Sequence, residues 1–448
     1  MSLDSGTRFD FPTLTHIKSI PQNWNIVRLK HVVADFVSGG TPESGNNEFW
    51  TDSEDGVAWA AIGDMTRSAY IEFTDKKITL KGVIDKNLTI LPKGTLLYSM
   101  YASLGEVAEL GIPAATNQAI LGIYPAQKSI NKNFLKYWLK SLKPGLRVLS
   151  SSNTQDNLNL EKVRNLPILL PPLSEQQAIV DYLDRETAQI DSLIAAKERL
   201  LELLAEKRRA IITHAVTRGL NGDVSLRDTG VEWLGVIPSH WEVKKLKYLI
   251  FGIETGFTPQ SYNFPAQNGE WGVLKTGCVN GGVFNEQENK ALPDDIDIPA
   301  NLEVVVGDVL MSRASGSLDL IGSVALVNNK LNARLLLSDK TFRIKINHEV
   351  CDPQFFVNVM GAPLMRHQIR RAISGAEGLA NNIAQTDIRE FWLPVPPISE
   401  QKKIVEHVKS QTEKIDRLSE LAQSTIENLH ERRASLIAVV VSGQIEVK

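Results

Sequence analysis

Two groups of basic side chains in the sequence have the spacing of one helix face. They are Lys128, Lys132, Lys136 and Lys140 in the first half, and Arg366, His367, Arg370 and Arg371 at the matching place in the second. Residues four apart lie on the same face of an α-helix. A face of fixed cations can contact DNA phosphates, because binding releases the counterions that surround a duplex. The alternative is an ordinary solvated helix surface, and the spacing fits both.

Motifs for catalysis or cofactor binding are missing from the sequence. It contains no G-x-x-x-x-G-K-[ST] phosphate loop, no G-x-G-x-x-G turn and no H-E-x-x-H or paired C-x-x-C for zinc. The run from Asp352 to Phe355, D-P-Q-F, resembles the D-P-P-Y motif of amino-methyltransferases but lacks its second proline. No glycine-rich turn for a methyl donor precedes it, so we interpret it as a helix start. The sequence predicts a protein that is not itself an enzyme.

The composition limits the class of protein further. A chain of 448 residues predicts two or three domains, and 43% hydrophobic with 23% charged residues is ordinary for a globular protein. The net charge of −3 argues against a protein that grips nucleic acid by charge alone. No apolar run approaches the ~20 residues of a membrane span. The polar start MSLDSGTRFD predicts no signal peptide, and two cysteines predict no disulfide framework, so we expect a cytoplasmic location.

An internal duplication organises the chain. Residues 20–42 align with residues 237–259 at an offset of 217, sharing I-P-x-x-W, L-K and G-x-T-P. Further on, PPLSEQQAIVDYLDRETAQID (171–191) aligns with PPISEQKKIVEHVKSQTEKID (396–416) at an offset of 225. The repeat unit is about half the chain, whereas solenoid units have ~20–50 residues. The sequence therefore predicts a tandem duplication of a whole domain.

Each P-P-x-S-E-Q segment opens a predicted long helix with a seven-residue apolar repeat. The repeat consists of Leu183, Ile190, Leu204 and Ile211 in the first helix and Val408, Ile415, Leu429 and Leu436 in the second. About six heptads is a coiled-coil length. At ~1.5 Å per residue each helix would be longer than a domain of this size. We therefore expect the two helices to pair with each other, over the alternative that each packs only on its own domain.

The whole chain resembles the specificity subunit of type I restriction-modification systems. The resemblance rests on the half-repeat, PPLSEQ and PPISEQ, the WLGVIPSHW junction at 233–241, and the strand ends SGGTP and ETGFTP, and covers nearly all 448 residues. It implies two target recognition domains that each read one half of a bipartite double-stranded DNA target, asymmetric because the halves have diverged. It also implies that the helices space the domains and dock two modification (methyltransferase) subunits, which restriction subunits can join. S-adenosylmethionine, ATP and Mg²⁺ would belong to those partners, and this chain would hold no cofactor or metal.

The expected fold is α+β, with two tandem mixed α/β domains each followed by a long helix. By resemblance the helices pair as an antiparallel coiled coil with pseudo-two-fold symmetry, which would present both domains to DNA in the same pose. The predicted parts are recognition domain 1 (1–173), helix 1 (174–219), a linker (220–236), recognition domain 2 (237–398), helix 2 (399–443) and a tail (444–448).

The resemblance places the DNA contacts in loops at strand ends. In the family's pattern a strand ending in Ser-Arg-x-Gly presents polar groups to DNA, and Ser312, Arg313 and Ser315 match it loosely. An arginine fork can bind guanine, and a side-chain amide can bind adenine. The first half has Ser99, Tyr101 and Ser103 but no arginine, so its readout must differ. The other candidates are Thr41, Asn117, Gln118, Thr258, Lys275 and Thr276 in loops, and Lys132, Lys136, Lys140, Arg366 and Arg370 for phosphates.

Two rival functions are compatible with part of this pattern. A coiled-coil adaptor that binds only proteins would retain no DNA even with its partners present. The specificity part of a self-contained restriction enzyme would have catalytic motifs in the same gene product, and this chain shows none.

Overall fold

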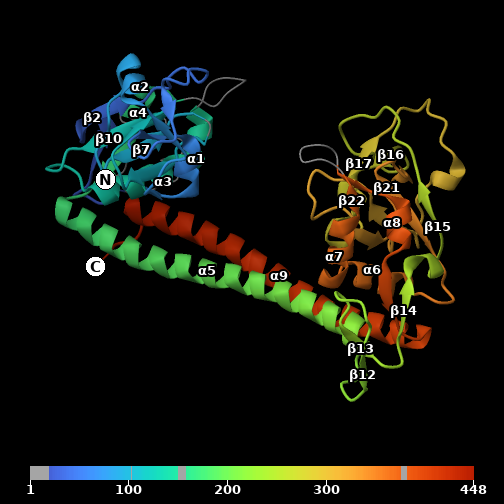
Figure 1. Cartoon of the computed structure of the whole chain (residues 1–448). Coiled ribbons are helices and arrows are strands. Elements are labelled where there is room, and N and C mark those ends of the chain that lie inside the picture. The colour runs from blue at the N-terminus through green and yellow to red at the C-terminus, as the bar shows by residue number, and fades with distance from the viewer. Residues whose placement is uncertain (1–19, 102, 150–157, 375–380, 448) are drawn as a thin grey trace. The chain divides into compact units, whose positions relative to one another are not determined.

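The computed structural model describes residues 20–101, 103–149, 158–374 and 381–447 (Figure 1). The prediction that the chain starts without a signal peptide falls on residues 1–19, outside those ranges. Within them, no helix combines the length and the apolar composition needed to cross a membrane. The chain divides into two compact units: unit 1 comprises Met1–Glu198 and Ser424–Lys448, and unit 2 comprises Arg199–Gln423.

The domain of unit 1 is built on two sheets. The larger has the strand order β2 (Val33–Ser38), β10 (Ile120–Pro125), β7 (Leu96–Ser99), β8 (Val107–Leu110), β5 (Tyr70–Ile71). The smaller has the order β3 (Trp50–Thr51), β6 (Lys76–Ile78), β4 (Val57–Ala60), β9 (Ala114–Thr116). A separate pair joins β1 (Asn25–Arg28) to β11 (Pro167–Leu170). The short helices are η1 (Leu29–His31), α1 (Ile62–Arg67), α2 (Leu80–Asp85) and α4 (Leu160–Arg164).

One helix, α3 (Lys132–Leu149), covers the larger sheet of unit 1. Its apolar face buries Phe134, Trp138 and Leu142 in one core with Leu96 and Leu121 of the sheet. The Trp138 indole N–H donates to the Pro167 carbonyl at 2.8 Å, so this large side chain is buried without an unpaired donor. The helix is thereby fixed between the sheet and the strand that leads into the long helix.

Unit 2 repeats this plan with changes. Its main sheet has the order β15 (Ile250–Thr255), β21 (Thr341–Ile346), β18 (Val309–Ser312), β19 (Val324–Leu326), and a second has β17 (Asn289–Ala291), β16 (Trp271–Leu274), β20 (Arg334–Leu336). The two-stranded pairs are β14 (Glu242–Lys245) with β24 (Trp392–Val395), and β22 (Ile373–Ser374) with β23 (Asn382–Ile383). The helices are η2 (Leu246–Tyr248), η3 (Thr276–Gly282), η4 (Ala300–Leu302), α6 (Pro353–Met360), α7 (Pro363–Ala372) and α8 (Gln385–Arg389). Where unit 1 has the single helix α3, which continues through Pro144, unit 2 has α6 and α7, with Ala362 extended between them and Pro363 in the first turn of α7, where proline is favoured.

The stretch 220–236, predicted as a linker, is an ordered part of unit 2. In it β12 (Leu226–Asp228) pairs antiparallel with β13 (Val236–Pro238). Gly230 and Gly235 take positive φ angles of 71° and 60° in the connecting turn, a conformation that favours glycine. Leu234 and Ile237 are buried in the core of unit 2. Their burial explains why this segment does not stay an extended linker.

The long helices are α5 (Leu173–Arg218) and α9 (Ile398–Val441), which start one residue before the predicted bounds and end within two residues of them. In unit 1, Leu183 shares a core with Val440, and further along α5 Asp191 pairs with Arg433 at 2.8 Å. Along the pair, residue numbers rise in α5 while the numbers of their partners in α9 fall, so the helices run antiparallel. Unit 2 shows the same direction, with an ion pair between Arg208 and Asp416 at 3.4 Å.

The eight predicted heptad residues all lie on inward faces of these helices. Leu183, Ile190, Leu204, Val408 and Ile415 are buried, and Ile211, Leu429 and Leu436 are half-buried. The offset of 225 that relates the helix sequences also carries the Arg433–Asp191 pair onto the Arg208–Asp416 pair. The duplication therefore extends from the apolar residues to the ion pairs beside them.

Candidate nucleic-acid interface

The repeated Glu-Gln pair fastens each long helix to its domain. In unit 1 the fully buried Gln176 accepts a hydrogen bond from the Asn131 backbone N–H at 2.7 Å and donates to the Pro171 carbonyl at 2.8 Å. Its neighbour Glu175 accepts from the Trp24 indole N–H at 2.8 Å. The start of α3, the start of α5 and the I-P-x-x-W segment are thus held at one joint.

The same joint exists in unit 2. The Gln401 amide oxygen accepts from the Asp352 N–H at 2.8 Å, and its nitrogen donates to the carbonyls of Val350 and Pro396 at 2.9 Å each. Glu400 accepts from the Trp241 indole N–H at 3.1 Å. Asp352 caps the first turn of α6, which confirms that the D-P-Q-F run is a helix start. The I-P-x-x-W and P-P-x-S-E-Q motifs recur together because they form this joint.

Three neighbouring strands gather the predicted loop residues of unit 1 at one edge of the larger sheet. Strand β10 runs antiparallel to both β2 and β7, with Leu121 opposite Ser38 and Ile120 opposite Ser99. The start of β10 therefore lies beside the ends of both neighbours. We call the polar residues at this place reading edge 1; they are Thr41, Tyr101, Ser103, Asn117 and Gln118.

A side-chain hydrogen bond joins two of the segments that form reading edge 1. The Thr41 hydroxyl, three residues after β2, donates to the amide oxygen of Gln118, two residues before β10. The side chain of Gln118 is exposed, whereas Tyr101, Ser103 and Asn117 are half-buried. The Asn117 amide oxygen already accepts a hydrogen bond from the Ala119 N–H at 3.0 Å. Gln118 is therefore the residue of this edge best placed to reach a ligand.

Unit 2 builds the equivalent edge with different side chains. Strand β21 pairs with β15 and β18, placing Phe342 opposite Thr255 and Thr341 opposite Ser312. We call Thr258, Arg313, Ser315 and Asp339 reading edge 2. The Thr258 hydroxyl donates to the Asp339 carboxylate, and an Arg313 guanidinium nitrogen donates to the Asp339 carbonyl at 3.2 Å. Arg313 also lies over the Phe342 ring, 5.6 Å from its centroid.

Asp339 is a residue of this edge that no motif in the sequence marks. It stands two residues before β21, as Gln118 stands two residues before β10, and each accepts a hydrogen bond from the threonine of its repeated G-x-T-P segment. Aligning the two halves through this strand would have found it. A carboxylate can accept a hydrogen bond from the cytosine amino group, so Asp339 belongs with the base-reading candidates.

Close backbone approach explains the repeated glycine of the G-x-T-P segments. A Cβ at Gly39 would lie 2.2 Å from the Asn117 carbonyl oxygen, and one at Gly256 would lie 1.7 Å from the Leu337 carbonyl oxygen. Both distances are far inside van der Waals contact. Only glycine lets the chain after β2 or β15 pass against the segment that carries Gln118 or Asp339.

Two predicted serines lie inside the fold and not at its surface. Ser99 and Ser312 are 0% exposed. The Ser99 hydroxyl donates to the Ser103 carbonyl and accepts from the Glu106 N–H at 2.8 Å, while the Ser312 hydroxyl donates to the Ala314 carbonyl at 3.4 Å. A fully buried hydroxyl cannot reach a base edge in this conformation. These serines instead shape the loops that follow β7 and β18.

The lysines of α3 are engaged with their own domain. Lys132 pairs with Glu109 of β8 at 2.6 Å, and Lys136 lies 3.7 Å from the other oxygen of the same carboxylate. The acid comes from a strand distant in sequence, so the helix alone gave no sign of it. Phosphate binding by these two lysines, which remains a prediction, would have to compete with Glu109.

Arg366 and Arg370 of α7 hold the loop that follows β18. Arg366 donates to the carbonyls of Asp319, at 2.7 Å, and of Ile321. Arg370 pairs with the Asp319 carboxylate at 2.7 Å. These contacts hold both arginines to the part of the loop at Asp319 and Ile321, so phosphate binding by either one would have to compete with them.

Lys275 and Thr276 follow β16, outside the three-strand edge. Strand β16 runs parallel to β20, with Val273 beside Leu336, so the two strands end together. Lys275 is half-buried and lies 3.6 Å from the Glu288 carboxylate. Within the described ranges no group of three His, Cys, Asp or Glu side chains could hold a metal ion.

Lys140 is half-buried like Lys132 and Lys136, but it forms no ion pair with a residue that the structure describes. Burial, together with the charges of Lys136 and Arg433, lowers the pKa of Lys140 to about 8, although Glu106 and Asp191 oppose the shift. An unfolded lysine titrates near 10.5. Between pH 8 and pH 10.5 the unfolded chain therefore binds more protons than the folded one, so raising the pH stabilises the fold.

We accordingly expect the free energy of unfolding of the wild-type chain to gain a rising contribution between pH 8 and pH 10.5 that Lys140→Met lacks. Urea unfolding of both proteins at steps across this range measures the difference. Other groups titrate equally in both proteins and cancel. If the difference in the free energy of unfolding between the wild type and Lys140→Met does not change with pH, the lowered pKa of Lys140 is contradicted.

The structure contains two diverged copies of one domain, each held to an antiparallel helix pair. Each copy gathers different polar residues at one sheet edge. This arrangement defines a two-part recognition protein. The family model described as "Type I restriction modification DNA specificity domain" matches residues 21–203 and again residues 238–428. The chain belongs to this family.

Curated relatives and a solved structure agree with this membership. The chain is 23% identical over 382 residues to the EcoKI specificity subunit of Escherichia coli K12, covering 83% of this chain and 79% of that one. It is 24% identical over 453 residues to the putative MjaX specificity subunit of Methanocaldococcus jannaschii, covering 97% and 96%. A structure from work on "complex assembly" and "conformational transition of the type I R-M system" superposes with a TM-score of 0.67 at 15% identity, covering 95% of this chain and all of that one. That similarity shows the fold.

Proposed function

We propose that this chain gives a type I restriction-modification complex its DNA sequence specificity, with each unit reading one half of a bipartite target. One observation carries the proposal: the same three-strand edge occurs in both units but presents Thr41 and Gln118 in one and Thr258, Arg313 and Asp339 in the other. Shared geometry gives both halves the same way of meeting a duplex. Different donors and acceptors give them different base preferences.

The two edges differ in the chemistry they offer to bases. Gln118 carries an amide, which matches the paired donor and acceptor of adenine in the major groove. Arg313 offers a cationic donor fork, and Asp339 offers acceptors, which match guanine and cytosine respectively. The half-site read by unit 2 should therefore contain a G·C pair that contacts Arg313.

Methyl transfer and cleavage belong to partner subunits in this proposal. Two modification subunits dock on the chain and supply S-adenosylmethionine and the methyltransferase site, and restriction subunits can add ATP- and Mg²⁺-dependent cleavage. The complex works in the cytoplasm, where its DNA is. The net charge of −3 fits a protein whose partners contribute much of the grip on the phosphate backbone.

The proposal is tested by mapping methylated adenines in cells that express the chain with its modification subunit. We expect one bipartite, asymmetric motif, and no methylation by the purified chain alone. Methylation by the chain alone would show that it is an enzyme. A modification complex that holds the chain but no DNA would favour the adaptor alternative instead.

Arg313→Ala should relax discrimination at one base pair of a single half-site. Loss of a bidentate base contact costs ~1–3 kcal/mol at that position and leaves the other half-site unchanged. Arg313→Lys is the matched variant, because it keeps the charge but not the planar fork. The readout is the methylated motif of each variant, and a motif equally strict at every position would show that Arg313 reads no base.

If Lys132 contacts phosphate, Lys132→Ala should change DNA affinity without the change in base preference expected for Arg313→Ala. A phosphate contact carries no sequence information, so affinity should fall for all sequences and its dependence on salt should flatten. Titrating the assembled complex with target and non-target DNA at several salt concentrations separates the cases. Unchanged affinity at every salt concentration would assign Lys132 to Glu109 alone.

A further inference from the structure

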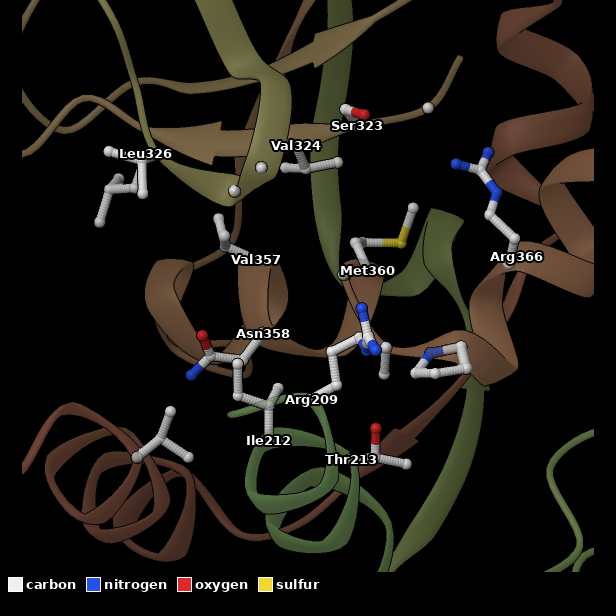
Figure 2. A pocket seen from close by; sticks show the side chains of 18 of the residues that line it. Arg209, Ile212, Thr213, Ser323, Val324, Leu326, Val357, Asn358, Met360 and Arg366 are labelled. Atoms are coloured by element: carbon white, nitrogen blue, oxygen red, sulfur yellow. The ribbon is translucent and has the colours of Figure 1, made fainter. Parts of the chain in front are cut away.

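A large cavity lies entirely within unit 2, beside its helix pair. Its volume is about 1390 Å³ (Figure 2). The lining residues come from five segments: 208–213 of α5, 281–284, 319–328 around β19, 354–371 in α6 and α7, and 405–412 of α9. Several lining residues are apolar, and we call this set the apolar floor; it includes Ile212, Val324, Leu326, Val357 and Met360. Sites for small ligands usually measure ~300–1,000 Å³, so this space suits a segment of a macromolecule better than a metabolite.

The corresponding place in unit 1 is bridged by a side-chain hydrogen bond. The joint glutamines bond Asn131 and Asp352, which marks these two residues as equivalent. Counting onward from them, Tyr137 corresponds to Asn358; along the long helices, Asp184 corresponds to Lys409. The Tyr137 hydroxyl donates to the Asp184 carboxylate at 2.6 Å in unit 1, whereas Asn358 and Lys409 line the open cavity of unit 2.

Glycine widens the same space. Counting from Asn131 and Asp352 in the same way, the half-buried Lys140 corresponds to Gly361, which lines the cavity. Next to it the helix is interrupted at the extended Ala362, whereas α3 of unit 1 continues without a break. The two halves have therefore diverged at this junction in volume and in charge.

The charge of the cavity is strongly positive. Its cationic lining residues are Arg208, Arg209, Arg366, Arg370, Arg371 and Lys409, against one acid, Asp319, which Arg370 already holds. Neither the Arg209 side chain nor the Lys409 side chain has a charged or hydrogen-bonding partner among the residues that the structure describes. The Nε of Arg366 is buried without a hydrogen-bond partner. In Figure 2 Arg209 extends from α5 toward Met360, at the apolar floor.

Unpaired cations beside an apolar floor fit an amphipathic acidic protein segment. Such a helix places apolar anchors at i, i+3, i+4 and i+7 in a groove, and carboxylates on its flanks would pair with arginine in the fork geometry that arginine favours. A DNA backbone would match the cations but would leave the apolar floor facing water. The chemistry of the lining thus selects a protein partner.

We propose that this cavity receives an acidic amphipathic segment of one modification subunit, a proposal that rests on the function proposed above. The apolar anchors lie on Val324, Val357 and Met360, and the carboxylates pair with Arg209 and Lys409. Because unit 1 has Tyr137 and Asp184 at this junction, the two modification subunits dock unequally. The one at unit 2 gains contacts that the one at unit 1 lacks.

The test is the stoichiometry of the complete complex, measured by native mass spectrometry on the full chain purified with its modification subunit. Arg209→Glu with Lys409→Glu should convert a complex of two modification subunits and one specificity chain into a one-to-one complex. We expect the affinity for the lost subunit to fall at least tenfold. Lys290→Glu with Lys330→Glu changes the net charge equally outside the cavity and should leave two subunits bound.

A second variant guards against a folding defect. Asn358→Tyr with Lys409→Asp gives unit 2 the side-chain pair that unit 1 has. It should lower the affinity of unit 2 for its modification subunit to that of unit 1, so that both subunits bind with one affinity, while circular dichroism stays that of the wild type. Two bound subunits at wild-type affinity in both variants would overturn the proposal but leave the specificity function intact. Two bound subunits with uniformly weaker DNA binding would also overturn it, by assigning the cavity to nucleic acid. A wild-type chain that binds no modification subunit would instead refute the proposed function.

Discussion

Adding one heptad to both long helices should lengthen the unread spacer of the DNA target while both half-site sequences stay the same. The insertions belong between Glu198 and Arg199 in α5 and between Gln423 and Ser424 in α9, where each helix passes from one unit to the other. Seven residues preserve the apolar seam and add ~10 Å of helix at ~1.5 Å per residue. At ~3.4 Å per base pair the spacer should grow by up to about three base pairs.

The helical twist of DNA limits how many base pairs the spacer can gain. Each added base pair rotates the second half-site around the duplex axis, and partner subunits must absorb the rotation. An insertion of two residues is the matched control, because it rotates the apolar faces of α5 and α9 out of register and should abolish assembly. Genome-wide methylation mapping reads out each variant. A heptad variant that methylates with an unchanged spacer would show that the helices do not set the spacing.

Gln401→Met should destabilise unit 2 by roughly 3–5 kcal/mol, a large part of the ~5–15 kcal/mol that a domain typically has. The methionine fills the same space but leaves the Asp352 N–H and the carbonyls of Val350 and Pro396 without partners. Each buried polar group left unpaired costs ~1–3 kcal/mol. The first turn of α6 should therefore separate from the start of α9.

Hydrogen exchange followed by mass spectrometry locates this effect. Peptides of unit 2 should lose protection in Gln401→Met, and peptides of unit 1 should lose it in Gln176→Met, which breaks the bond to Asn131. Lys402→Met, one residue along and exposed, should change neither. Equal protection in Gln401→Met and the wild type would mean that the joint does not hold the domain to its helix.

The duplication, the two long helices and the repeated motifs are predictable from the amino-acid sequence, because these features are periodic or local. A heptad repeat such as that of Leu183 and Ile190 is set by neighbours along one helix, and tertiary packing only has to complete it. The offset of 225 also related Asp191 to Asp416 before any contact was known. The resemblance built on these patterns led to the family to which the chain belongs.

Which polar side chains are free to meet a ligand depends on contacts between distant parts of the chain. The partner of Lys132 and Lys136 is Glu109, which β8 brings from another part of the chain, and sequence spacing gives no information on such a contact. Burial of Ser99 likewise depends on how β7 packs in the sheet. The charged cavity of unit 2 requires five separate segments to converge around Arg209 and Lys409. Helical periodicity acts over a few residues, whereas burial and ion pairing act through space between residues far apart in sequence.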